Sequence, residues 1–225
     1  MPHCAIIFDF DGVLADSEVL SNSVLADIVT ELGVPTTVDD AYRNFMGKRQ
    51  QEIVEAIELA VGRTLPANFL EDYQSRTFEA FRRELRAIQG AREFIESWGH
   101  VPRCIASSSS PERLALCLDV LDMKKLFDGR VFSASSVARG KPHPDIFLHA
   151  AREIGVDPGE CVVIEDSVGG VIAARAAGAT AIGLTAAGHI QAGHDARLRE
   201  AGAHHVVHSF AELDQAIRPL LRGAS

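Results

Sequence analysis

Short apolar segments alternate with helical segments over most of the chain, and this alternation constrains the fold more than any other feature. Buried strands are expected at residues 103–106, 130–132, 161–164, 179–184 and 205–207. Helices are expected at residues 91–98, 112–121, 144–154, 168–177 and 210–220. Strands that alternate with helices favour a parallel sheet that is covered on both faces. The sequence therefore predicts an α/β fold built on a doubly wound, Rossmann-like parallel sheet.

A helical block interrupts this alternation near its start. Residues 4–8 form a sixth short apolar segment, which is typical of a buried parallel strand. From residue 18 to about residue 86, apolar residues recur at helical spacing instead. We therefore expect an α/β core made of residues 1–15 and 90–225, with an α-helical domain, residues 16–89, inserted after the first strand.

The acidic balance of the chain limits its partners. The 225 residues are 47% hydrophobic and carry a formal net charge of −9. A surface of this charge repels nucleic acid and anionic membranes, so neither is an expected partner. No stretch reaches the roughly 18 apolar residues of a membrane span, and no basic leader precedes the first strand. We expect a cytoplasmic protein, and a monomer.

Acidic pairs follow two of the predicted strands. Asp9 and Asp11 come directly after the first strand, and Glu165 and Asp166 follow a later one. Ligands bind beyond the carboxyl ends of the strands in open parallel sheets, and clustered carboxylates repel one another unless a cation offsets them. Mg²⁺ suits such oxygen ligands. Turn formation at Asp11-Gly12 and capping of the next helix by Asp166 are the structural alternatives.

Two further polar segments occupy equivalent places. Ser107 is the first polar residue after the second predicted strand, and Ser108 follows it before a helix start that suits an anion. Lys141 stands between a glycine and a proline, and a lysine held beside an acidic cluster can neutralise phosphate charge. An ordinary helix cap and a solvated loop lysine are the alternatives.

In combination, these motifs resemble the haloacid dehalogenase superfamily. The matching segments are DFDGVLADSE at residues 9–18, the serine at position 107, GKPHPD at residues 140–145 and EDS at residues 165–167. The resemblance covers almost the whole chain, and the helical insertion resembles the small helical cap of that family. The nearest branch contains β-phosphoglucomutase-like proteins and 6-phosphogluconate phosphatases.

The resemblance implies a magnesium-dependent phosphatase that acts on a small sugar or sugar-acid phosphate. Asp9 would be the nucleophile that forms an aspartyl phosphate, and Asp11 would be the general acid and base. Mg²⁺ would be held by Asp9, the Asp11 carbonyl, Asp166 and Glu165. Ser107 and Lys141 would bind the transferring phosphoryl group, next to Gly12 and Ser108.

The expected partner is therefore a small phosphorylated metabolite, and the helical cap would select it. The resemblance places a specificity loop between two predicted helices at Gly47, Lys48 and Arg49. The two cations would meet polar or anionic groups of the substrate, and Glu18 would face the same cleft. A solvated cluster of charges at a helix start is the alternative.

Five other functions are weighed at this level. A phosphomutase would use the same intermediate, but β-phosphoglucomutases carry a histidine where this chain has Ser21. A dehalogenase needs neither Mg²⁺ nor Asp11, and a phosphonate hydrolase needs a Schiff-base lysine whose motif does not match Lys48. A non-catalytic phosphosugar-binding module is an alternative of a different class, because it is not an enzyme. A nicotinamide-binding fold lacks support because no GxGxxG follows a predicted strand.

Overall fold

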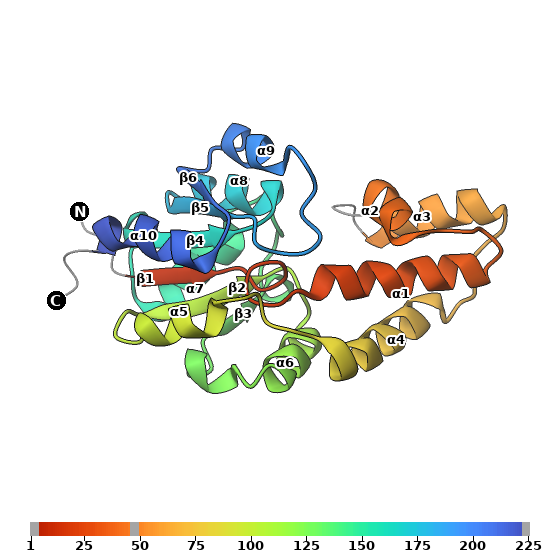
Figure 1. Ribbon diagram of the computed structural model, residues 1–225, viewed down its shortest axis with the longest axis horizontal. Coiled ribbons are helices and arrows are strands. Elements are labelled where there is room, and N and C mark those ends of the chain that lie inside the picture. Colours follow the sequence, from red (N-terminus) through yellow and green to blue (C-terminus); the bar gives the residue numbers. More distant parts are fainter. Residues whose placement is uncertain (1–4, 46–49, 222–225) are drawn as a thin grey trace. The chain divides into compact units, whose positions relative to one another are not determined.

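A computed structural model describes residues 5–45 and 50–221 of the chain. It contains one six-stranded sheet in which every neighbouring pair of strands is parallel, in the order β3-β2-β1-β4-β5-β6. The strands are β1 (Ala5–Phe8), β2 (Arg103–Ser107), β3 (Val131–Ser133), β4 (Cys161–Glu165), β5 (Thr180–Leu184) and β6 (His205–Val207). The parallel α/β fold is therefore confirmed (Figure 1).

The strand order reverses at β1, which places this strand in the middle of the sheet. β1 pairs with β2 on one side and with β4 on the other, with Ile7 opposite both Cys104 and Val163. Every residue of β1 is buried, which explains why the strand is a continuous apolar run. The crevice at such a reversal is the usual ligand site of open α/β sheets.

Helices cover both faces of the sheet. They are α5 (Ala91–Ser97), α6 (Pro111–Val120), α7 (Asp145–Ile154), α8 (Val168–Ala176), α9 (His194–Glu200) and α10 (Phe210–Leu221). Ala5 and Ile7 share one buried cluster with residues of α7, α8 and α9. Phe8 points to the other face, where its ring meets Phe94 of α5 at a centroid distance of 6.1 Å. The alternation along β1 thus fills both layers of the core.

The elements differ from expectation in a few places. Two predicted strands continue one residue further, so Ser107 ends β2 and Glu165 ends β4. Helix α9 was not predicted, because Leu198 is its one buried residue and a single apolar position gives no periodicity. The polar residues that end β2 and β4 still pair with the neighbouring strand through their backbones. A prediction based on apolar residues therefore ends these strands one residue too early.

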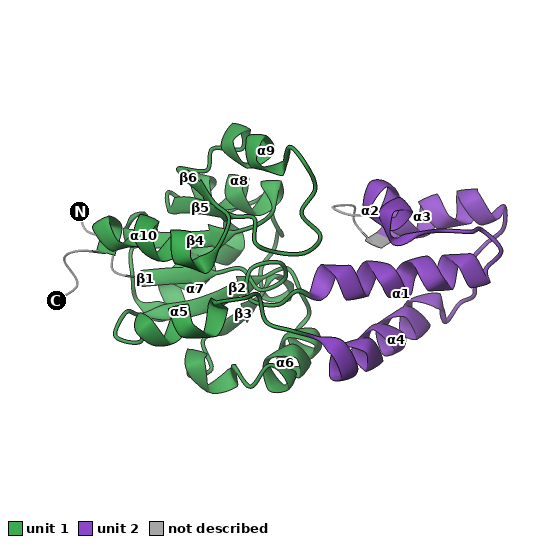
Figure 2. Cartoon of the chain, in the orientation of Figure 1, with its two compact units in different colours: residues 1–16, 86–225 green, residues 17–85 purple. Residues whose placement is uncertain are grey.

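The inserted segment forms a separate compact unit of residues 17–85, close to the expected 16–89 (Figure 2). It consists of α1 (Ser17–Glu31), α2 (Val38–Asn44), α3 (Gln50–Val61) and α4 (Phe69–Glu84). Its own core includes Val29, Ile57 and Phe69. Helix α2 starts with a capping box in which Thr37 accepts from the Asp40 backbone and Asp40 accepts from the Thr37 backbone.

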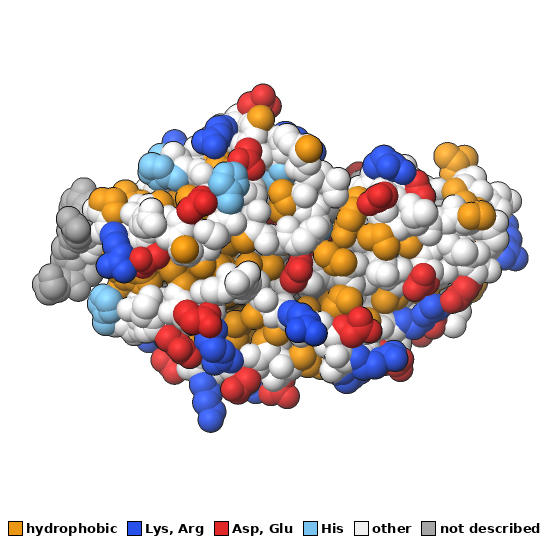
Figure 3. All heavy atoms as spheres, in the orientation of Figure 1, with side chains coloured by type: hydrophobic (Ala, Val, Ile, Leu, Met, Phe, Trp, Pro, Cys, Tyr) orange, Lys and Arg blue, Asp and Glu red, His pale blue; other side chains and the backbone are white. Residues whose placement is uncertain are grey.

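The surface is mixed in charge. Acidic and basic side chains are interspersed over the face drawn in Figure 3, and no single sign dominates a large area there. Across the described residues, no helix combines the length and the apolar sequence that a membrane crossing requires.

Candidate active site

Three carboxylates converge at the carboxyl ends of β1 and β4. Asp9 follows β1, Glu165 is the last residue of β4 and Asp166 is the next residue. The two strands are neighbours, and the Asp9 N–H donates to the Ile164 carbonyl at 2.9 Å. One oxygen from each carboxylate lies within 4.8 Å of the others, and all three residues are buried. The fold thus brings together two acidic segments that lie far apart in the sequence.

Lys141 supplies the positive charge of this cluster. Its Nζ donates to Asp9 Oδ1 at 2.8 Å and to Glu165 Oε1 at 2.5 Å. The side chain is 7% exposed, and Nζ lies 5.0 Å from the centre of the Phe147 ring. A buried ammonium that is paired with two carboxylates is held in one place. The structure therefore brings Lys141 to the acidic cluster that the sequence predicted it would serve.

Burial and crowding set the ionisation of these groups. Burial raises the pKa of Asp9 well above its usual value, Lys141 opposes this, and the charges of Glu165 and Asp166 add to it. Burial disfavours the charged form of Lys141, but Asp9 and Glu165 outweigh it and raise the pKa of the lysine. The two acidic neighbours thus keep Lys141 in its charged form within the cluster.

The donor set fits a hard divalent cation. Oxygen ligands of one such ion lie at most about 4–5 Å apart, because metal–oxygen distances are roughly 2.1–2.6 Å. The three carboxylate oxygens fall within this range, and a cation would offset the repulsion that raises the pKa of Asp9. Asp9, Glu165 and Asp166 are thus the side chains among the described residues that could hold the ion.

Glu165 accepts hydrogen bonds from three donors. Its Oε2 accepts from the backbone N–H of Ser167 at 2.8 Å and from the Ser167 hydroxyl at 2.9 Å, while Oε1 accepts from Lys141. Both oxygens therefore have donors before any ligand binds. This arrangement makes Glu165 the group that anchors the lysine as well as a candidate ligand.

Two glycines make room for the carboxylates. A Cβ on Gly12 would lie 1.9 Å from Asp166 Oδ2, and the glycine has a φ of +76°, which disfavours other residues. A Cβ on Gly170 would lie 1.7 Å from Glu165 Oε1. The glycine that follows the two aspartates in the first motif is thus required by the packing of Asp166 as well as by the turn.

The Asp11 carboxylate points to a different set of partners. Its Oδ2 accepts from the Ser109 hydroxyl at 2.6 Å, and its Oδ1 accepts from Arg113 Nη2 at 2.7 Å and Nε at 3.2 Å. The expectation that both acidic pairs cluster is therefore wrong for the Asp11 side chain, whose carboxylate lies outside the group formed by Asp9, Glu165 and Asp166. A role in metal binding would rest on its backbone carbonyl, as the resemblance implies.

The remaining predicted residues lie in several places. Ser107 is buried at the end of β2, where its hydroxyl accepts from the Ser109 backbone at 3.1 Å. Ser108 is exposed in the following loop. Glu18 lies in the first turn of α1 and accepts from Asn22 at 3.3 Å, within the helical unit. Gly47, Lys48 and Arg49 lie outside the described residues.

Three residues at this site were missed by the sequence analysis. Arg113 of α6 holds Asp11, while His189 and His194 both contact Asp166. The two histidines follow β5, so they occupy the same edge of the sheet as the predicted site. Their place after a strand was a usable signal, but the segment contained no acidic residue or lysine that would have drawn attention to it.

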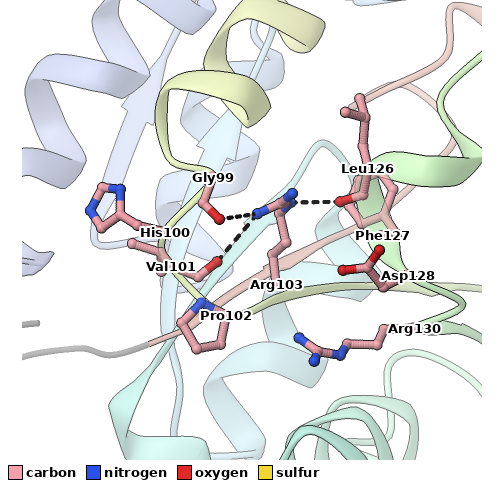
Figure 4. A pocket seen from close by; sticks show the side chains of 9 residues that line it. All are labelled: Gly99, His100, Val101, Pro102, Arg103, Leu126, Phe127, Asp128 and Arg130. Atoms are coloured by element: carbon pink, nitrogen blue, oxygen red, sulfur yellow. Dashed lines mark hydrogen bonds between the residues drawn. The ribbon is translucent and has the colours of Figure 1, made fainter.

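A shallow pocket lies at the opposite edge of the sheet, where β2 begins (Figure 4). Its central side chain is Arg103, which donates to the carbonyls of Gly99 and Leu126 at 3.0 and 2.8 Å. These contacts tie the turn before β2 to the segment before β3. The arginine is thus engaged with backbone oxygens, and the residues that line the pocket are not those of the carboxylate cluster.

Comparison with known proteins agrees with this geometry. A family model for haloacid dehalogenase-like hydrolases matches residues 5–178. The 6-phosphogluconate phosphatase of Escherichia coli is 30% identical over 77% of this chain and 79% of its own length. The phosphorylated carbohydrates phosphatase of Thermotoga maritima is 35% identical over 77% of this chain and 81% of its own length.

A solved structure extends the similarity to nearly the whole chain. A HAD family hydrolase from Deinococcus radiodurans, crystallised with bound phosphate and sodium, is 36% identical and gives a TM-score of 0.84. The match covers 97% of this chain and 96% of that one. The motifs indicated the branch that contains 6-phosphogluconate phosphatases, and the relatives agree. This chain therefore belongs to the haloacid dehalogenase-like hydrolase family.

Proposed function

We propose that this protein is a Mg²⁺-dependent phosphatase that hydrolyses a small sugar or sugar-acid phosphate through phosphoryl transfer to Asp9. The observation that carries the proposal is the buried group of three carboxylates with Lys141 between two of them. Family membership supports the hydrolase class, and the names of two relatives support phosphorylated carbohydrates as the substrate class.

Asp9 is the proposed nucleophile. It lies at the end of the central strand, where its backbone is fixed by the hydrogen bond to Ile164. Its carboxylate would attack phosphorus, the bond from phosphorus to the leaving oxygen would break, and an aspartyl phosphate would form. Water would then cleave the phosphorus–oxygen bond to Asp9. A bound Mg²⁺ would offset the charge of the carboxylates and of the phosphoryl oxygens.

Lys141 and Ser107 are the proposed binding groups for the phosphoryl oxygens. Phosphoryl transfer depends mainly on positioning and on charge neutralisation. Lys141 is held at the cluster by Asp9 and Glu165, and Ser107 ends the neighbouring strand. Because both groups are buried and oriented before substrate binds, they would stabilise the transition state at little reorganisation cost.

Asp11 is the proposed general acid and base. It would protonate the departing alkoxide and later accept a proton from the attacking water. Ser109 and Arg113 fix its carboxylate from two directions. These contacts orient the carboxylate that would exchange the proton.

The helical unit is the part of the chain that we expect to select the leaving group of the substrate. Lys48 and Arg49 are the residues that we expect to meet polar groups of the leaving group. Ser21 replaces the histidine of β-phosphoglucomutases and is buried in α1. Since a serine does not exchange protons as an imidazole does near neutral pH, hydrolysis is favoured over phosphate migration.

The test is a phosphate-release screen over phosphorylated metabolites, with and without Mg²⁺. We expect turnover of sugar phosphates that stops with EDTA and returns with added Mg²⁺. Asp9→Asn should abolish turnover, and Asp119→Asn, on the exposed surface of α6, should leave it unchanged. Substantial turnover by Asp9→Asn, or by protein that has been freed of divalent ions, would contradict the proposed function.

A further inference from the structure

The geometry points to His189 as a positioning residue that orients the Asp166 carboxylate for cation binding, with His194 fixing the backbone of the same residue. This inference rests on the metal site of the proposed function. Metal-ligating carboxylates are themselves commonly hydrogen-bonded, and those partners tune the affinity of the site. His189 contacts the Asp166 carboxylate and His194 contacts its backbone carbonyl. Neither histidine belongs to a motif that the sequence indicated.

The first observation is the contact between His189 and Asp166. The imidazole Nε2 lies 3.1 Å from Asp166 Oδ2, and both side chains are 7% exposed. An N–H at this nitrogen would engage one carboxylate oxygen and leave Oδ1 for the cation. A buried hydrogen bond to a charged group is stronger than one in water, and it restricts rotation of the carboxylate.

The second observation is the packing around this pair. A Cβ on Gly12 would lie 1.9 Å from Asp166 Oδ2 and 2.8 Å from His189 Cε1. The carboxylate and the ring therefore both lie against the Gly12 backbone. Any side chain at position 12 would overlap both groups, so the glycine is needed for the imidazole to reach the Asp166 carboxylate here.

The third observation is the way in which His194 is held. Its Nε2 lies 2.5 Å from the Asp166 carbonyl oxygen, and its Nδ1 lies 3.1 Å from Arg197 Nη2. An arginine can only donate, so Nδ1 accepts and Nε2 carries the proton that is donated to the carbonyl. His194 thus links the first turn of α9 to the backbone of Asp166.

The segment that carries both histidines is anchored as well. It runs from the end of β5 to α9, and the Gly188 N–H donates to Asp16 Oδ1 at 3.1 Å. The Gln191 side chain donates to the His189 carbonyl at 3.3 Å. The backbone around His189 is therefore held by hydrogen bonds at residue 188 and at its own carbonyl. A residue that orients another group needs such a fixed backbone.

The test is the affinity of the substrate-free protein for Mg²⁺, measured by titration calorimetry. His189→Phe keeps the ring volume but removes the donor, and we expect it to weaken binding by about 10–100-fold. His189→Gln restores a donor and should recover most of the affinity. His205→Phe, on the exposed edge of β6, is the matched control and should bind as the wild type does.

A second variant keeps the test independent of folding. His194→Gln retains a donor of similar reach, so it should fold and should weaken Mg²⁺ binding less than His189→Phe does. Equal Mg²⁺ affinity in the wild type and in folded His189→Phe would overturn the inference while leaving the proposed function intact. If the wild type binds no divalent cation, the metal site of the proposed function fails, and the inference fails with it.

Discussion

At the scale of single residues, Lys141 is the cation that pairs with two of the buried carboxylates of the site. It is buried between Asp9 and Glu165, and it is the group whose pKa rises because of their proximity. Removing one partner of a buried ion pair leaves the other charge buried, without water or an opposite charge to stabilise it. The residue therefore links the stability of the fold to the chemistry of the site.

Lys141→Met should destabilise the metal-free protein by about 3–5 kcal/mol at neutral pH, because it strips the ammonium from buried carboxylates. Urea unfolding measures this loss. In the variant, burial and the charges of Glu165 and Asp166 keep the pKa of Asp9 above its unfolded value. Ionisation of Asp9 then opposes folding, so the loss should shrink as the pH falls and this carboxyl binds a proton.

Lys125→Met, at an exposed position, is the control for that experiment and should change the unfolding free energy little. A Lys141→Met protein as stable as the wild type, or one whose loss grows as the pH falls, would contradict the electrostatic description of the site.

The sequence predicted the residues of the site whose side chains are typical of a metal or phosphate centre. Asp9, Glu165, Asp166 and Lys141 were found because they follow apolar strands, and the parallel sheet brings them to one edge. The partner of Asp11 was not predicted, since the hydrogen bonds to Arg113 depend on the three-dimensional course of the loop before α6. Roles assigned to individual residues remain predictions.

At the scale of elements, the start of α8 shapes the site. The Ser167 hydroxyl accepts from the Gly170 N–H at 3.0 Å and so caps the helix. The same hydroxyl donates to Glu165. The absent side chain of Gly170 leaves the space that this carboxylate occupies. The Ser167 hydroxyl therefore positions the Glu165 carboxylate and also caps the first turn of α8.

The neighbouring glycines of α8 provide a matched pair of variants. In Gly170→Ala, the new Cβ would overlap the Glu165 carboxylate, so we expect a loss of about 1–3 kcal/mol in unfolding free energy and a marked loss of turnover. Gly169 has open space around it, so Gly169→Ala should be neutral or gain up to about 1 kcal/mol from helix propensity, with normal turnover. Thermal unfolding and phosphate release measure both. Equal behaviour of the two variants would refute the packing argument.

Helices and strands were predictable where burial is periodic. The strands flanking the site and α7 carry clear apolar patterns, whereas α9 has one buried side chain and left no such pattern. That gap had a consequence for function, because His194 begins α9 and His189 lies in the segment before it. An unpredicted element thus concealed two residues that contact Asp166.

At the scale of the whole molecule, the order of the elements determines where chemistry is possible. Asp9 and Glu165 are far apart in the sequence, and they meet because β1 pairs directly with β4. The sequence order of strands and helices was enough to predict a parallel sheet and a site at its carboxyl edge. The strand neighbours themselves were not predicted, since pairing depends on how the crossovers pack.

The central claim is that Asp9 becomes phosphorylated, and borohydride trapping tests it most directly. Borohydride reduces an acyl phosphate to an alcohol, so quenching during turnover of a sugar phosphate should convert Asp9 to homoserine, which peptide mass spectrometry locates. The account predicts reduction at Asp9 that requires both substrate and Mg²⁺ and disappears with EDTA. Phosphate release without any reduced residue, or reduction at a different carboxylate, would contradict it.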